Sequence, residues 1–96
     1  MSETEVLTVY TTAFCGDCIA AKRALDGLGV PYREVRLEED DSAVAYVEAV
    51  NHGRRSVPTL AFGDHAASLS RFSPRRLHEF LQGAGLSPRG AAASGA

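Results

Sequence analysis

The stretch Phe-Cys-Gly-Asp-Cys at residues 14–18 decides the fold, because it holds both cysteines of a 96-residue chain and follows a short apolar run. The two cysteines stand three positions apart, so one helical turn can carry both. The surrounding pattern predicts a buried strand over residues 6–10 and an amphipathic helix that begins near Cys15 and stops at Gly29. This order places Cys15 at the N-terminus of the helix and Cys18 one turn into it.

Composition limits what the protein can do. A hydrophobic content of 45% in 96 residues is enough for one small core. The formal net charge of −2 gives no electrostatic reason to expect nucleic acid or an anionic membrane as a partner. No apolar run approaches the length of a membrane span, and the acidic start lacks the features of a signal peptide. We therefore expect a cytoplasmic protein. Separately, we expect the protein to be a monomer.

Working outward from the cysteine pair, the chain predicts three more strands and two more helices. The strands are expected at residues 31–37, 57–62 and 65–69, and the helices at 42–51 and from Pro74 to about Gly83. The order β-α-β-α-β-β-α predicts an α/β fold with a four-stranded mixed sheet flanked by three helices. The two β-α-β units predict parallel pairing, and the final hairpin adds an antiparallel edge. Residues 1–86 form the expected domain, and residues 87–96 a flexible tail.

The acidic run at residues 38–41 precedes the second expected helix. Carboxylates at a helix N-terminus complement the helix dipole, so we interpret the run as structural and expect no metal site there.

The placement of the cysteines predicts redox chemistry. Free backbone N–H groups and the helix dipole stabilise a thiolate at Cys15, while Cys18 lies on the apolar face and can still close a disulfide. Cys15 would therefore attack a substrate disulfide and Cys18 would resolve the mixed disulfide. Two alternatives stay open. A structural zinc needs about four ligands, which the scattered histidines do not complete, and a structural disulfide over this spacing stabilises little.

The residues around the pair also carry a resemblance. With Tyr10-Thr11-Thr12 before the cysteines and Val57-Pro58-Thr59 ahead of a short hairpin, residues 6–82 resemble the glutaredoxin family of the thioredoxin superfamily. Within it, the chain is most similar to the mycoredoxin-type proteins of actinobacteria. The resemblance implies a thioredoxin-like, glutaredoxin-type fold and a cis Val57–Pro58 bond opposite the cysteines. It also implies that the backbone of Val57 pairs with that of the substrate.

The same resemblance directs attention to four further residues. Thr12 stands where glutathione-using members commonly carry a lysine, so the natural thiol need not be glutathione. Arg71 lies where those members tend to have a Gly-Gly step, and offers positive charge instead. Phe14 is expected to form an apolar rim for docking. The charge of Asp17 opposes thiolate formation at Cys15 but also interacts favourably with the helix N-terminus. Our hypothesis is that Asp17 makes Cys15 less acidic and tunes partner choice.

The resemblance thus implies a thiol-disulfide oxidoreductase with no bound cofactor or metal. Its co-substrate would be a low-molecular-weight thiol: mycothiol, bacillithiol or glutathione. Its partners would be proteins with disulfides or mixed disulfides, with that thiol or thioredoxin reductase as reductant. Three alternatives remain: a redoxin passing electrons from thioredoxin reductase to ribonucleotide reductase, an iron–sulfur or metal-binding module, and a redox-inactive interaction domain.

Overall fold

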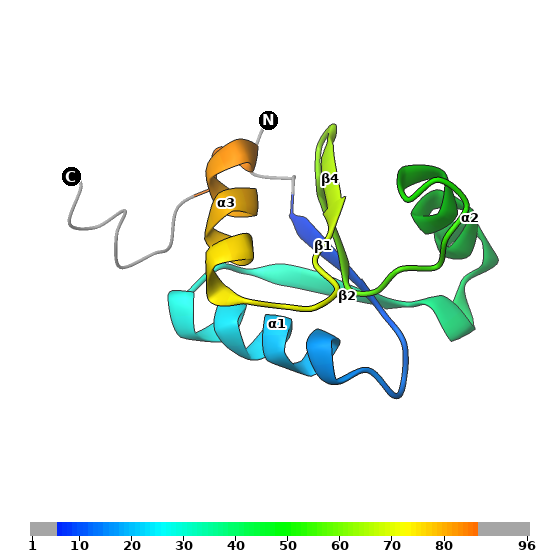
Figure 1. The fold of residues 1–96 in the computed structure, drawn as a ribbon, viewed down its shortest axis with the longest axis horizontal. Helices are drawn as coiled ribbons and strands as arrows, with labels where there is room; N and C mark the ends of the chain where they lie inside the picture. The colour runs from blue at the N-terminus through cyan, green and yellow to red at the C-terminus, as the bar shows by residue number, and fades with distance from the viewer. Residues whose placement is uncertain (1–5, 87–96) are drawn as a thin grey trace.

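The computed structural model describes residues 6–86, so the tail expected at residues 87–96 lies outside the described residues. The predicted order of helices and strands is confirmed, with one added 3-10 turn, η2 (Figure 1). The elements are β1 Leu7–Thr11, α1 Gly16–Leu28, β2 Tyr32–Arg36, η2 Leu37–Glu39, α2 Asp41–Val50, β3 Thr59–Phe62, β4 His65–Ser68 and α3 Pro74–Ala84.

The sheet is mixed, with strand order β2-β1-β3-β4. β1 and β2 are parallel, whereas β3 is antiparallel to β1 and β4 is antiparallel to β3. The expectation that the second β-α-β unit would also pair in parallel is therefore wrong. After α2 the chain returns to the end of β1, where Thr59 pairs with Tyr10, so β3 must run backwards along β1.

The helices cover both faces of the sheet. Leu25 of α1 and Leu77 of α3 share one core cluster, whereas Val47 of α2 belongs to a second. Figure 1 shows the same division, with α2 apart from α1 and α3. Successive side chains of β1 point to opposite faces of the sheet. Val9 therefore packs in the first cluster, and Tyr10 packs against the second.

Local signals fix the helix ends. α1 ends at Gly29, whose φ of 72° is left-handed, as the stop signal predicted. α3 begins with Ser73, whose side chain accepts from the Arg76 N–H, and Pro74 follows it. α3 continues past Gly83, because the left-handed C-cap is Gly85. α2 is capped by Asp40, whose carboxylate accepts from two backbone N–H groups, rather than opened by Ser42.

No helix within residues 6–86 is both long and apolar enough to cross a membrane.

Candidate active site

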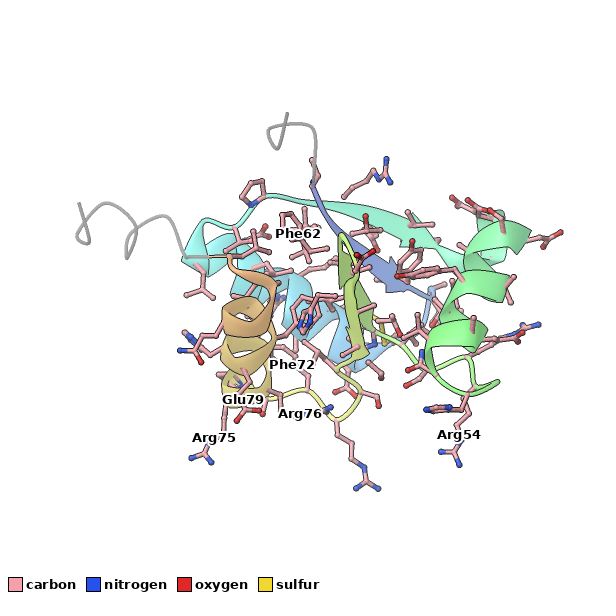
Figure 2. The ribbon with its side chains drawn as sticks, turned by 90° about the horizontal axis from the view of Figure 1, so that it is seen from above. Arg54, Phe62, Phe72, Arg75, Arg76 and Glu79 are labelled. Carbon is pink, nitrogen blue, oxygen red and sulfur yellow. A yellow bond between two sulfur atoms is a disulfide. The ribbon has the colours of Figure 1, made fainter. Side chains whose placement is uncertain are left out.

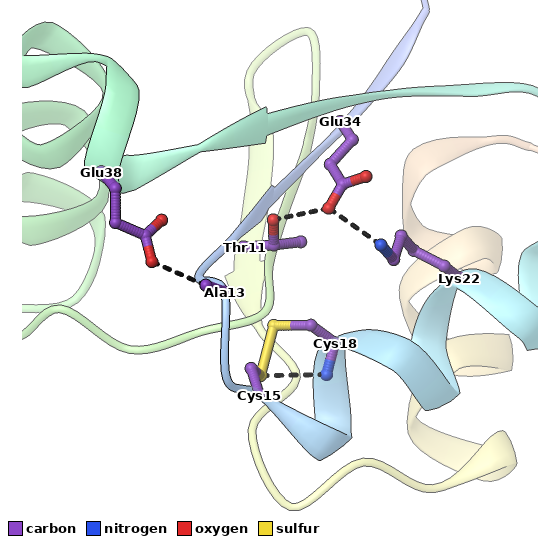
Figure 3. A network of polar contacts seen from close by, with 7 residues as sticks. All are labelled: Thr11, Ala13, Cys15, Cys18, Lys22, Glu34 and Glu38. Atoms are coloured by element: carbon purple, nitrogen blue, oxygen red, sulfur yellow. Dashed lines mark hydrogen bonds and ion pairs between the residues drawn. A yellow bond between two sulfur atoms is a disulfide. The ribbon is translucent and has the colours of Figure 1, made fainter.

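Both cysteines lie at the start of α1, directly after the loop that leaves β1 (Figure 3). They form a disulfide with their Cα atoms 5.2 Å apart. Cys15 has extended backbone and is the N-cap of α1, and its Sγ accepts from the Cys18 N–H at 3.0 Å. A thiolate at this sulfur in the reduced protein is stabilised by that N–H group and by the helix dipole.

The two sulfurs differ in their access to solvent. Cys18 is only 2% exposed, whereas Cys15 is partly exposed. Solvent therefore reaches Cys15 more readily than it reaches Cys18.

Glu38 holds the loop before the cysteines, and sequence reasoning missed it. Its carboxylate accepts from the Ala13 N–H at 2.7 Å, across 25 positions of sequence. This hydrogen bond lowers the pKa of Glu38. The interpretation of the acidic run as a helix start holds for Asp40, but Glu38 instead fixes the approach to Cys15.

A second polar network lies beside the disulfide (Figure 3). The carboxylate of Glu34 accepts from the buried Thr11 hydroxyl at 2.7 Å and from the Lys22 ammonium at 2.9 Å. Lys22 first, and then Thr11, lower the pKa of Glu34. The network ties α1 to β1 and β2, and so fixes the helix that carries both cysteines.

The Val57–Pro58 bond is cis, as the resemblance implied. The turn around it is held by Thr59, whose hydroxyl donates to the Ser56 carbonyl at 2.6 Å and accepts from the Asn51 amide at 3.1 Å. Pro58 is buried, and its carbonyl accepts from the Leu69 N–H at 2.7 Å. Within residues 6–86 the N–H and C=O of Val57 make no hydrogen bond, so both remain available to another chain.

Asp17 contacts the loop between β4 and α3. Its Oδ2 accepts from the Arg71 N–H at 2.8 Å, although the two residues are 54 positions apart. Arg71 has a left-handed backbone, with φ of 58°. The structure thus joins two predicted site residues that sequence reasoning treated separately.

Arg76 is a second residue that the sequence did not indicate. Arg76 lies in the first turn of α3 (Figure 2). Its guanidinium donates to the carbonyl of Ser68, at 3.0 Å, and to that of Ser70. These contacts tie the loop before α3 to the first turn of that helix. Since the acceptors are backbone carbonyls, nothing in the local sequence could have identified them.

The remaining predicted residues differ in exposure. Phe14 is fully exposed, at 101%, so its ring lies outside the core. Thr12 is partly buried and makes no side-chain hydrogen bond within residues 6–86. No cluster of three or more potential metal ligands occurs in this part of the chain.

An open hollow of about 590 Å³ lies between the C-terminal end of α2 and β4. Three serines on its lining, Ser56, Ser68 and Ser70, are joined by hydroxyl hydrogen bonds. The cysteines do not line the hollow, but the serine cluster connects the segment before Val57 with the loop before Arg71.

Comparison with known proteins agrees with this geometry. The family model for glutaredoxin matches residues 7–66, which include the cysteines, the cis-proline and three of the four strands. The chain belongs to the glutaredoxin family. The resemblance predicted from the sequence is confirmed, and with it a redox protein of the glutaredoxin type that carries a Cys15–Cys18 pair. Members of this family are thiol-disulfide oxidoreductases that use thiol co-substrates.

Relatives include actinobacterial proteins. A protein of Mycobacterium tuberculosis (strain H37Rv) named as a candidate glutaredoxin is 44% identical over 61 residues, covering 64% of this chain and 73% of that protein. Mycoredoxin 1 of Corynebacterium glutamicum is 34% identical over 58 residues, covering 60% of this chain and 71% of the relative.

Solved structures confirm the fold. Glutaredoxin from Archaeoglobus fulgidus superposes with a TM-score of 0.69 at 17% identity, covering 82% of this chain and 88% of that one. The glutaredoxin-like protein NrdH-redoxin from Escherichia coli superposes with a TM-score of 0.57 at 29% identity, covering 65% and 79%. The predicted thioredoxin-like, glutaredoxin-type fold is therefore correct.

The carboxylates around the site make stability depend on pH. The pKa of Glu34 is lowered from 4.5, and that of Asp40 from 3.8, the latter chiefly by the Ser42 hydroxyl. The unfolded chain therefore binds these protons more readily. The stabilisation is complete above the ordinary carboxyl pKa values and is lost as the pH falls through the lower folded values.

We therefore expect the melting temperature to fall between pH 6 and about pH 3, and to fall less in Glu34→Gln. Thermal unfolding followed by circular dichroism measures both effects. Glu39→Gln is the control, because Glu39 is exposed and its side chain makes no hydrogen bond within the described residues. Equal acid sensitivity in wild type and Glu34→Gln would show that the Thr11–Glu34–Lys22 network does not contribute.

Proposed function

We propose that the protein reduces protein disulfides, and mixed disulfides between proteins and a low-molecular-weight thiol, with Cys15 as nucleophile. The observation that carries this proposal is the pairing of an accessible Cys15 at a helix N-terminus with Cys18, 2% exposed and bonded to it. A helix N-terminus favours the thiolate that attacks, and a shielded neighbour suits the resolving thiol.

In the route that uses one cysteine, the Cys15 thiolate attacks the small-thiol sulfur of a mixed disulfide. The protein substrate leaves as its thiolate, and the small thiol stays on Cys15. A second molecule of the small thiol, as thiolate, then attacks this new bond. It restores Cys15 and carries the two electrons away as the oxidised small-thiol disulfide.

In the route that uses both cysteines, Cys15 first forms a mixed disulfide with one sulfur of the substrate's disulfide. Cys18, deprotonated, attacks Cys15 and releases the fully reduced substrate after proton uptake. The product is the Cys15–Cys18 disulfide, the form seen in the structure. A small thiol or thioredoxin reductase then supplies two electrons to reduce it.

Substrate binding follows from groups that the fold leaves free. The unpaired N–H and C=O of Val57, held by the buried Pro58, would add a substrate segment as a short strand. The exposed Phe14 would contact apolar substrate groups beside Cys15. Thr12 and Arg71 would contact the polar part of the substrate. We place this activity in the cytoplasm, where a reducing supply keeps such a pair active.

Two sources of electrons are supported by different similarities. Similarity to a protein named mycoredoxin 1 supports a small thiol of the mycothiol kind. The structural match to an NrdH-redoxin described as having a thioredoxin-like activity profile supports thioredoxin reductase as a second candidate.

The deciding experiment compares peptide mixed disulfides of mycothiol, bacillithiol and glutathione, each with its own thiol as reductant, against reduction through thioredoxin reductase and NADPH. We expect peptide thiol to be released by the protein under at least one of these conditions. Absence of turnover with all four systems, in folded protein with reduced cysteines, would refute the proposed reductase function.

Cys18→Ser separates the two routes. We expect the variant to keep reduction of mixed disulfides within about threefold, because that route needs only Cys15. Reduction of an intramolecular protein disulfide should fall about a hundredfold, because no resolving thiol remains. Steady-state rates on both substrate types measure the difference. Equal losses on the two would contradict the assignment of Cys18 as the resolving cysteine.

A further inference from the structure

The carboxylate of Asp17 makes a contact near the cysteines to which the proposed function assigns no role. Asp17 lies between the two cysteines, in the first turn of α1, and accepts the Arg71 N–H at 2.8 Å. No lysine, arginine or histidine within residues 6–86 lies within ion-pair distance of its carboxylate. A carboxylate without a paired cation therefore lies beside the nucleophile.

The loop that Asp17 contacts is also held by α3. Arg76 donates to the carbonyls of Ser68 and Ser70, and Ser70 belongs to the serine cluster. Arg71 lies between these attachments with its left-handed backbone, and its N–H points at α1. The Arg71 N–H is thus a backbone donor of this loop that faces the first turn of α1, and Asp17 accepts it.

Without Asp17, the same position would suit an external carboxylate. It combines the Arg71 N–H, the positively polarised N-terminus of α1 and the exposed Arg71 side chain. With Asp17 present, the donor is already used, and a second carboxylate would meet a like charge. The internal carboxylate therefore competes with carboxylates carried by the substrate.

We propose that Asp17 is a specificity-determining residue that disfavours substrates bearing a carboxylate next to the reacting disulfide, and so favours disulfides whose small-thiol part is neutral there. This inference rests on the proposed reductase function and names the class of small thiol that the site accepts. Asp17 makes this selection by occupying the Arg71 N–H and by placing a negative charge at that position.

The test uses one peptide carrying either of two mixed disulfides of similar size, with 2-mercaptoethanol or with 3-mercaptopropionate. Only the second carries a carboxylate. The readout is the ratio of kcat/KM for the carboxylate substrate to that for the neutral substrate. A change in the acidity of Cys15 alters both rates together, so the ratio isolates the effect of Asp17 on substrate charge.

Asp17→Asn removes the charge, while its amide oxygen can still accept the Arg71 N–H. From the loss of the charge alone we expect this ratio to rise about fivefold, mostly through a lower KM for the carboxylate substrate, as suits a partly exposed charge. The matched control is Asp26→Asn, which removes the same charge from the exposed last turn of the same helix. Its ratio should equal that of wild type. Thermal unfolding of both variants confirms that they are folded.

A second measurement varies the ionic strength. Raising the ionic strength screens a partly exposed charge, so the ratio of the wild-type protein should rise with salt. The ratio of Asp17→Asn should not rise, because the charge that remains at this position, from Arg71 and the N-terminus of α1, is positive. An unchanged ratio in Asp17→Asn, or equal gains on both substrates, would overturn the inference while leaving the reductase function in place. Failure of wild type to reduce even the neutral substrate would overturn both.

Discussion

Cys15→Ser is expected to lower the rate of disulfide reduction at least about a thousandfold, the largest effect of any single substitution in this chain. A serine hydroxyl is not ionised near neutral pH and cannot form the disulfide intermediate on which both routes depend. The rate is measured with a peptide mixed disulfide under the reductant that supports wild-type turnover.

The fold should tolerate this change. Cys15 is the N-cap of α1, where its sulfur accepts the Cys18 N–H, and serine is among the residues preferred at that position. The melting temperature of Cys15→Ser should therefore lie within a few degrees of that of the reduced wild type. More than a tenth of wild-type activity in the folded variant would contradict the assignment of Cys15 as nucleophile.

Leu77→Ala is expected to cause the largest loss of stability, about 2–5 kcal/mol in the free energy of unfolding. Leu77 has 0% exposure, and its cluster includes Leu25 of α1 and Leu60 of β3. Truncation leaves a cavity where α3 packs against the sheet. Denaturant unfolding measures the change. His78→Ala, on the exposed face of the same helix, should alter stability by less than about 0.5 kcal/mol.

A loss below about 1 kcal/mol in Leu77→Ala would mean that neighbouring side chains fill the cavity, or that α3 contributes little to the core. The same result would weaken the description of one core shared by α1, the sheet and α3.

The parts of the fold that the sequence predicted are those set by local chemistry. Gly29 ends α1 because it adopts a left-handed φ, and Ser73 with Pro74 starts α3 because each suits its position at a helix N-terminus. Cys15 and Cys18 were predicted as a redox pair from their three-residue spacing at the start of a helix, which is a local feature of the sequence. The existence and order of the elements followed from such signals.

The direction of β3 could not be predicted in this way. It depends on where residues 51–58 bring the chain back to the sheet, and that is set by the packing of α2 against Val35, Val57 and Tyr10. The order of strands and helices along the chain is the same whether β3 runs parallel or antiparallel to β1. The error therefore arose from a tertiary arrangement that no local signal records.

The contacts that build the site were missed for a related reason. Glu38 reaches Ala13 across 25 positions and Asp17 reaches Arg71 across 54, and in each case the partner is a backbone N–H. Backbone groups carry no side-chain signature, so composition and spacing cannot identify such partners. The sequence indicated that Asp17 is unusual, but only the structure shows what its carboxylate contacts.

The most direct test of the central claim uses the two proteins that each keep a single cysteine, Cys18→Ser and Cys15→Ser. Each is reduced and mixed with a peptide carrying a mixed disulfide, and the released peptide thiol and the protein mass are followed over time. We predict that Cys18→Ser releases about one equivalent of peptide thiol and gains the mass of the small thiol at Cys15. Cys15→Ser should release none over the same period. Release by Cys15→Ser at a similar rate would contradict the account.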